Sequence, residues 1–302
     1  MEAVIADNSL QKNVRFVVTD NASNMMKAMS VLFHAGDASC IDPNADPSLW
    51  EDMDADEYES VFASLPARMS CFAHSLQLVV REGGLAAMGV IRCTLVKCSK
   101  LANLVLQSAL FRSVFEAELG TGKAIPVTND TRWNSTYRQL QAIVGLDRDK
   151  LSSALQQSKR ENLIVTTKEY QQLRDLISIL EPFAQATDLT QANKTVTVSC
   201  IVPVILSLTK TLTSMLRQLT TFSTLLKNRL TGLYDRLSHV FEALGIRRSP
   251  HLPPLDRARQ LQFDNNIMLM AAVLDPTFGF QWLQDHPGSV EETHDLQQRI
   301  TG

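Results

Sequence analysis

Residues 17–25 read Val17-Val18-Thr19-Asp20-Asn21-Ala22-Ser23-Asn24-Met25. The β-branched run up to Thr19 predicts a short buried strand, which polar Asp20 and Asn21 end. A helix over residues 24–34 can then begin, with Asn21 or Ser23 as its cap. A carboxylate at the tip of a strand is exposed and rigidly held, as a ligand of a divalent metal must be, and Asp20 has this position. An acid at a strand end is also a common helix cap.

Outward from this stretch, the sequence predicts one more strand and then a long series of helices. Residues 67–71 fit a second strand, and helical apolar spacing starts at His74 and breaks at Gly83-Gly84. A long helix is expected to follow and to end near residues 120–122, with another helix over residues 131–143. The chain contains only 12 glycines and 11 prolines, which is too few for a strand-and-turn architecture of this size. The fold class that we predict is mainly α with a small α/β part.

Further along, the chain carries three helix signals and one linker. Residues 166–169 form a capping box, and Pro182 is expected to end or kink the helix that follows. Apolar residues from Ile201 to Leu237 predict one helix, or two in line, of roughly 40 residues. Sparse flanking charges favour a packed helix over a coiled-coil seam. Residues 249–254 are a Pro-rich linker, an apolar segment covers 267–274, and the polar end from His286 is expected to be frayed.

Charge is unevenly placed along the chain. The formal net charge is −3, which argues against a uniformly basic nucleic-acid binder. Residues 37–60 contain nine acids and no Lys or Arg, so the remainder has a net charge of +6. The segment predicts a solvated acidic loop, or alternatively an acidic gate that screens a basic face. The nine acids are Asp37, Asp42, Asp46, Glu51, Asp52, Asp54, Asp56, Glu57 and Glu59.

The cysteines and the hydropathy favour an intracellular protein. Five cysteines form no regular disulfide framework, and the amino terminus lacks the features of a signal peptide. No apolar run is long enough to predict a transmembrane span. We therefore expect reduced thiols and no membrane partner.

Two further motifs carry possible chemistry. Cys71-Phe72-Ala73-His74 has the spacing of two zinc ligands on one turn, but tetrahedral zinc needs three or four protein ligands and no credible others stand nearby. We therefore predict no metal here. In Arg132-Trp133-Asn134, the indole of Trp133 can stack on an unpaired base while Arg132 contacts a phosphate, although core packing explains the same Trp.

In this order, the three motifs resemble the transposase domain of the hAT superfamily of DNA transposons. The third motif extends over Asp130-Thr131-Arg132-Trp133-Asn134-Ser135-Thr136, and the resemblance spans about residues 14–280. It is strongest to domesticated relatives that usually carry an N-terminal BED zinc finger. It implies a partial RNase H-like fold over residues 1–80, a helical insertion domain over 81–248, and a linker with a helical segment over 249–302.

The resemblance also implies roles for individual residues. Asp20 matches the second of three metal-binding acids, His74 matches an element that organises the edge of the active site or contacts a phosphate, and Trp133 matches a residue that stacks at a flipped base. The family's enzymes use Mg²⁺, and a pair of such ions needs several carboxylates. No counterpart of the first acid precedes residue 14. The third acid and the C-terminal dimerisation region are expected to lie beyond residue 302.

We therefore expect a hAT-transposase-derived protein without transposase activity and without a cofactor, nuclear and associated with DNA or chromatin proteins. Two alternatives stay open. One is a fragment of an active metal-dependent transposase, and the other is a helical scaffold that binds proteins.

Overall fold

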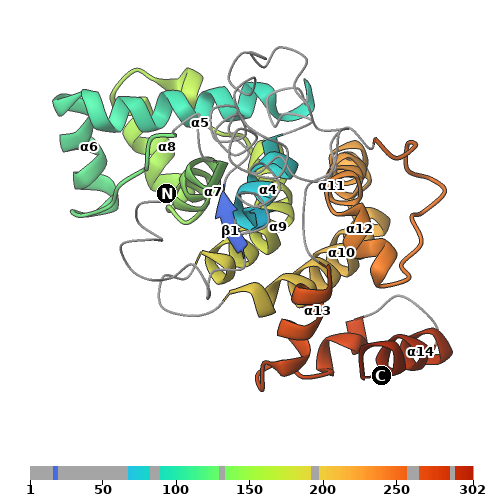
Figure 1. Cartoon of the computed structure of the whole chain (residues 1–302). Helices are drawn as coiled ribbons and strands as arrows, with labels where there is room; N and C mark the ends of the chain where they lie inside the picture. The colour runs from blue at the N-terminus through green and yellow to red at the C-terminus, as the bar shows by residue number, and fades with distance from the viewer. Residues whose placement is uncertain are drawn as a thin grey trace, which may run out of the picture. The chain divides into compact units, whose positions relative to one another are not determined.

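The computed structural model describes residues 16–19, 67–81, 89–128, 133–191, 197–256, 265–285 and 290–301. The chain forms two compact units, residues 1–75 with 261–264 and residues 76–260 with 265–302. The described residues are mainly helical and contain one two-stranded sheet, so the predicted fold class is confirmed (Figure 1). The predicted helix over 24–34 and the acidic loop over 37–60 lie outside the described residues.

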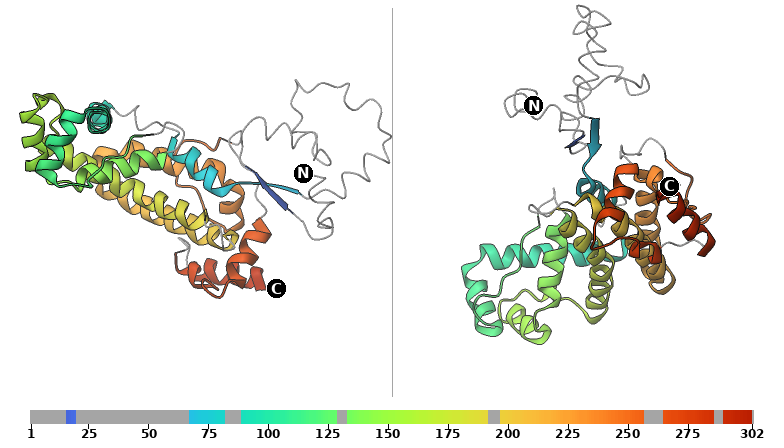
Figure 2. Two further views of the ribbon diagram at one scale, coloured as in Figure 1. Left: turned by 90° about the vertical axis from the view of Figure 1, so that its left-hand side faces the viewer. Right: turned by 60° about the horizontal axis from the view of Figure 1, so that its bottom comes forward.

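The first unit holds a parallel pair of strands, β1 (Phe16–Thr19) and β2 (Ala67–Ser70). The two strands lie beside each other (Figure 2), and in the ladder Val18 pairs with Met69 and Thr19 with Ser70. Both predicted strands are therefore confirmed, but β1 is not the buried strand that was predicted, because Val18 is 60% exposed. The pairing extends one step past β2, because the backbone N–H of Cys71 donates to the carbonyl of Thr19 at 2.8 Å.

Helix α4 (Phe72–Arg81) follows β2 after one residue. The predicted helical spacing holds, since Leu76, Val79 and Val80 are all buried. The hydroxyl of Ser75 donates to the carbonyl of Cys71 at 2.9 Å, which ties the first turn of the helix to the end of the strand.

The described part of the second unit contains helices and no strand. Helices α7 and α9 pack against each other, α10 contacts α9, α11 and α13, and α6 contacts α8. The helices are α5 (Gly89–Gln107), α6 (Ala109–Leu119), α7 (Trp133–Val144), α8 (Arg148–Gln157), α9 (Thr167–Thr190), α10 (Ile201–Gln218), α11 (Ser223–Arg236), α12 (Ser238–Ala243), α13 (Asn265–Leu274) and α14 (Val290–Thr301). Short 3-10 turns are η4 (Glu161–Leu163), η5 (Val198–Cys200), η6 (Thr220–Phe222) and η8 (Gln281–Asp285).

The long helix expected up to residues 120–122 is two helices, which corrects the prediction. Ser108 separates α5 from α6 and caps α6, since its hydroxyl accepts from the N–H of Phe111. The guanidinium of Arg112 donates to the carbonyls of Val105 and Leu106 at 3.1 and 3.0 Å. These bonds satisfy carbonyl groups at the end of α5, so the break costs few hydrogen bonds.

Two other helix predictions are also corrected. Pro182 does not end α9, which continues to Thr190 with the proline inside it. The apolar stripe from Ile201 to Leu237 is not one helix, because Leu219 leaves the helical conformation and η6 follows it. Helix α11 then packs against α10, so that the apolar side chains of both helices share one core.

The linker and the C-terminal segment are more ordered than the sequence predicts. Residues 249–256 contain no helix or strand, but Asp235 accepts from the guanidinium of Arg248 at 2.9 Å and from the N–H of Asp256 at 3.2 Å. The polar end expected to be frayed contains α14, whose Leu296 is buried. One apolar side chain per few turns is enough to dock a polar helix.

Helix α10 with the preceding turn (Val198–Gln218) is long and apolar enough to span a membrane by length and composition alone. Buried core helices pass the same test. Its side chains from Ile201 to Leu212 are largely buried against other helices, and this packing explains the composition.

Candidate functional site

The ends of β1 and β2 lie at one edge of the parallel pair. Thr19 is the last residue of β1, and its carbonyl receives the hydrogen bond from Cys71, the residue after β2. Ligand sites in α/β proteins lie outside the carboxyl ends of parallel strands. Asp20 follows Thr19 directly in the sequence but lies outside the described residues.

Cys71 and His74 stand where α4 begins. Cys71 is a free thiol, and both residues are half-buried. Within the described part of the chain, no three His, Cys, Asp or Glu side chains are grouped so that they could hold a metal ion. The structure thus adds no third or fourth ligand to the pair, and the absence of tightly bound zinc stays a prediction.

Trp133 begins α7 and is a core residue by its packing, with 5% of its surface exposed. Its ring contacts Tyr137 in a tilted arrangement and Phe183 edge-on, with centroids 6.3 and 6.5 Å apart. A base could stack on the indole only if the ring left these neighbours. Its proposed partner Arg132 lies outside the described residues, so the DNA role of the pair stays a prediction.

The electrostatic surroundings of Trp133 are acidic on the side of α9. Burial raises the pKa of the Tyr137 hydroxyl, and the negative charges of Glu181 and Asp188 raise it further. The side-chain N–H of Gln141 donates to the Tyr137 oxygen at 2.7 Å. Carboxylates near this ring oppose the approach of a DNA phosphate, and a phosphate contact would depend on cations elsewhere.

The structure shows an ion pair that the sequence did not reveal. Lys97 on α5 donates to both carboxylate oxygens of Glu169, at 2.8 and 3.0 Å. Glu169 also accepts from the backbone N–H of Thr166, which completes the predicted capping box. Burial alone would raise the pKa of Glu169, but the hydrogen bonds from Lys97 and Thr166 lower it below the ordinary value. The pair fixes the start of α9 to α5.

Cysteines on α5 differ sharply in their surroundings. Cys93 is exposed, whereas Cys98 is fully buried. Burial raises the pKa of the Cys98 thiol to about 12, and the charge of Glu169 adds to this effect. A thiol with such a pKa is a packing group and not a nucleophile.

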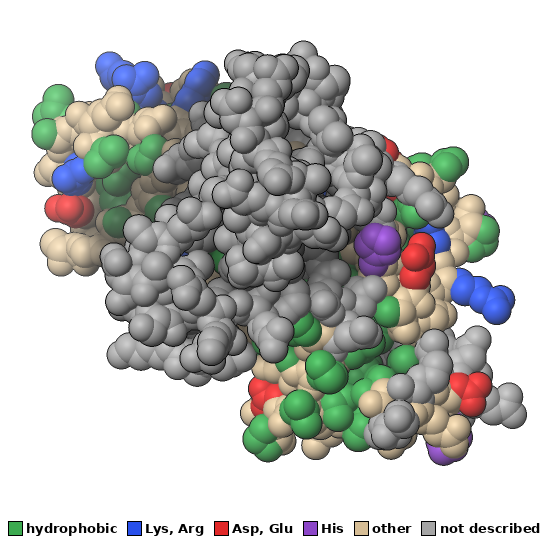
Figure 3. All heavy atoms as spheres, in the orientation of Figure 1, with side chains coloured by type: hydrophobic (Ala, Val, Ile, Leu, Met, Phe, Trp, Pro, Cys, Tyr) green, Lys and Arg blue, Asp and Glu red, His purple; other side chains and the backbone are tan. Residues whose placement is uncertain are grey.

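Exposed basic side chains are found on the α5–α6 part of the helical unit (Figure 3). Arg92 and Lys100 on α5 are exposed. Lys97 between them is held by Glu169. Such side chains can meet phosphates without reading a base sequence.

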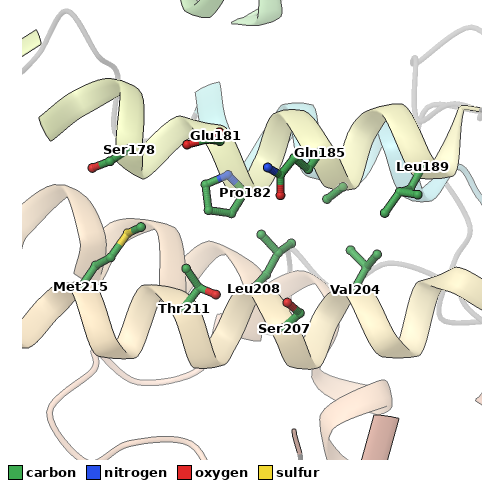
Figure 4. Close-up of a pocket in the computed structure, with 11 residues that line it drawn as sticks. Ser178, Glu181, Pro182, Gln185, Leu189, Val204, Ser207, Leu208, Thr211 and Met215 are labelled. Carbon is green, nitrogen blue, oxygen red and sulfur yellow. The ribbon is translucent and has the colours of Figure 1, made fainter. Parts of the chain in front are cut away.

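A groove between α9 and α10 is the other feature that sequence analysis missed (Figure 4). It has a volume of about 280 Å³. The one signal in the sequence was Pro182, which lies in the groove wall. A proline inside a helical pattern predicts an end or a kink of the helix, but it does not predict a groove. The groove is lined by Ser178, Glu181, Pro182, Gln185, Ala186, Leu189, Val204, Ser207, Leu208, Thr211 and Met215.

No protein-family model matches the chain, and no curated protein shows significant similarity to it.

Proposed function

We propose that the chain is a hAT-transposase-derived protein that associates with DNA or chromatin proteins in the nucleus and lacks transposase activity. The main support is the edge of the parallel pair, where the N–H of Cys71 binds the carbonyl of Thr19. Asp20 follows the first strand and the Cys71-x-x-His74 turn follows the second. The motifs of the resemblance thus come directly after neighbouring strand ends.

The proposed lack of transposase activity follows from the small number of matching metal-binding carboxylates. Holding two Mg²⁺ ions about 3.5–4 Å apart takes several carboxylates, which activate water and stabilise the leaving oxygen. Asp20 is the one acid in the 302 residues that matches the family's three. A single carboxylate cannot hold the pair, so the polypeptide by itself neither cleaves nor joins DNA.

A cleavage assay tests this part. The purified chain is incubated with hAT-type transposon ends and with Mg²⁺ or Mn²⁺, beside Asp20→Asn as the matched variant. We expect no metal-dependent strand cleavage or joining from either protein. Strand transfer by the wild type that Asp20→Asn abolishes would instead favour the alternative of an active transposase fragment.

DNA association would rest on phosphate contacts. Outside residues 37–60, Lys and Arg outnumber acids, and Arg92 and Lys100 are exposed on α5. Without a recognition module, such contacts are weak, independent of sequence and strongly dependent on salt. The nine acids of residues 37–60 repel DNA, so their deletion is expected to tighten binding.

A competition assay with duplex and hairpin DNA tests the association. Affinity should fall steeply with salt, and each neutralised phosphate contributes about −0.9 to the logarithmic slope for duplex DNA. Double charge reversal by Arg92→Glu and Lys100→Glu should weaken binding to both DNAs and reduce the slope. The double substitution Lys150→Glu and Lys159→Glu, at two exposed lysines of and after α8, is the control with the same change of charge. No binding at low salt, even after deletion of residues 37–60, would favour the helical scaffold.

The helical scaffold is kept as a second candidate because of the groove between α9 and α10. A groove between packed helices is a common docking place for a third helix.

A further inference from the structure

Two antiparallel helices form the walls of the α9–α10 groove. Leu189 on α9 lies opposite Val204 on α10, and at the other end Ser178 lies opposite Met215 (Figure 4). On α9 the lining extends from Ser178 to Leu189, which is about 16 Å of helix at 1.5 Å per residue. This length matches three turns of a helix laid along the groove.

The middle of the groove is apolar and its edges are polar. Ala186, Val204 and Leu208 form its buried apolar floor, and half-buried Pro182 is the accessible apolar side chain there. Leu189 at one end is 54% exposed and Met215 at the other end is half-buried, so both add accessible apolar area to the groove. Apolar anchors in the middle with a polar rim are the arrangement found where an amphipathic helix docks.

One exposed carboxylate lies on the polar rim near Pro182. Glu181 supplies the single charge among the lining residues, which include no Lys or Arg. Pro182 has no N–H, so it cannot give the carbonyl of Ser178 the bond that this group would receive in an uninterrupted helix. An exposed carboxylate beside accessible apolar side chains calls for a cationic donor.

We infer that this groove binds an amphipathic helix of a partner protein, with an arginine placed beside Glu181. The partner's apolar residues, spaced i, i+3 or i+4 and i+7, cover Pro182, Leu189 and Met215 along the groove. Arginine matches the site better than lysine, since its planar fork of donors can bind both carboxylate oxygens of Glu181 together. This function is separate from DNA association and uses neither Asp20 nor Trp133.

Two synthetic helical peptides of about 18 residues test the inference. Both carry leucines at i, i+3, i+7 and i+10 and a fluorescein label, and they differ only in a central Arg or Glu beside the leucine face. Fluorescence anisotropy with the full chain should show at least about tenfold tighter binding of the Arg peptide. In Glu181→Lys the preference should reverse. Asp188→Lys is the matched control, because Asp188 is exposed on the same helix but does not line the groove.

Two variants separate the groove from a general effect of charge. Ser207→Trp fills the groove from an exposed position, and Leu189→Asp adds a charge at its exposed end, so neither disturbs a buried residue. Both should lower the affinity for the Arg peptide about tenfold or more while the circular dichroism of the chain stays the same.

Three results would overturn the inference. The first is equal affinity for the two peptides, or a loss in Glu181→Lys no larger than in Asp188→Lys. The second is no binding of either peptide at about 1 mM. The third is a wild-type dimer in sedimentation that Leu189→Asp dissociates, because a second copy of the chain would then occupy the groove.

Discussion

At the residue scale, Trp133 can be interpreted either as a base-stacking residue or as a core residue. The resemblance gives it a base-stacking role, whereas its ring is buried against Tyr137 and Phe183. Among the residues that the structure describes, its indole N–H has no hydrogen-bond partner. The ring therefore contributes through packing, and any test of DNA stacking must first control for lost stability.

We expect Trp133→Ala to lower the free energy of unfolding by about 3–5 kcal/mol, because it leaves a cavity where a large ring was packed. Trp133→Phe keeps an aromatic ring and should cost less. Urea denaturation of the two variants checks this. If the alanine variant keeps the wild-type midpoint, the indole does not support the core. If Trp133→Phe alone loses hairpin binding while keeping its stability, the stacking role gains support.

Glu169 makes stability depend on pH. Its pKa is lower in the folded chain than the ordinary 4.5, so its contribution is present above that value and is lost as the pH falls through the folded pKa. Glu169→Gln keeps the shape but removes the charge that Lys97 binds. We expect it to cost about 1–3 kcal/mol at pH 7 and progressively less towards pH 3.

Urea denaturation of the wild type and Glu169→Gln between pH 3 and about 7 measures this difference. Lys97→Met completes a double-mutant cycle, and a coupling energy near zero would contradict the role of the pair. Asp149 is an exposed acid on α8, and Asp149→Asn should show no comparable change in the free energy of unfolding.

At the element scale, the corner between α5 and α6 is held by the cap from Ser108 together with the two bonds from Arg112. The Ser108 hydroxyl accepts from the N–H of Phe111 at 3.2 Å. Ser108→Ala removes this bond and should destabilise the chain by about 1 kcal/mol. Thermal unfolding checks the value. Ser113→Ala on the exposed face of α6 is the control, and equal effects of the two substitutions would refute the cap.

Elements governed by local chemistry could be predicted from the sequence. The strand ending at Thr19 and the capping box of Thr166 with Glu169 are set by neighbouring residues, and both are confirmed. The break at Ser108 was missed because the apolar spacing continues through it. The bonds from Arg112 that make the break inexpensive lie in the tertiary structure. The continuation of α9 past Pro182 likewise depends on packing against α7 and α10.

At the scale of the whole molecule, the candidate sites differ in how far sequence could find them. The edge beside Cys71 was predictable, because each strand ends in a recognisable motif. The groove between α9 and α10 was not, since it requires Leu189 and Val204 to meet across two helices. Residues that face each other between helices share no sequence pattern that marks them as neighbours.

For the whole chain we expect no tightly bound zinc. Cys71 and His74 provide two ligands, and tetrahedral zinc requires three or four. Metal analysis after dialysis should find far less than one equivalent of zinc in the wild type and no change in Cys71→Ser. Close to one equivalent, lost in Cys71→Ser, would show that further ligands complete the site.

The two cysteines of α5 allow the opening of the helical unit to be measured by alkylation. Alkylating reagents consume thiolates, so exposed Cys93 is modified at once, while buried Cys98 with its pKa near 12 must first be released by an opening of the unit. The ratio of the two labelling rates therefore measures how often the helices separate. Mass spectrometry after timed alkylation reads both cysteines in the same sample. We expect Ser108→Ala and Trp133→Ala to speed labelling of Cys98 and to leave that of Cys93 unchanged.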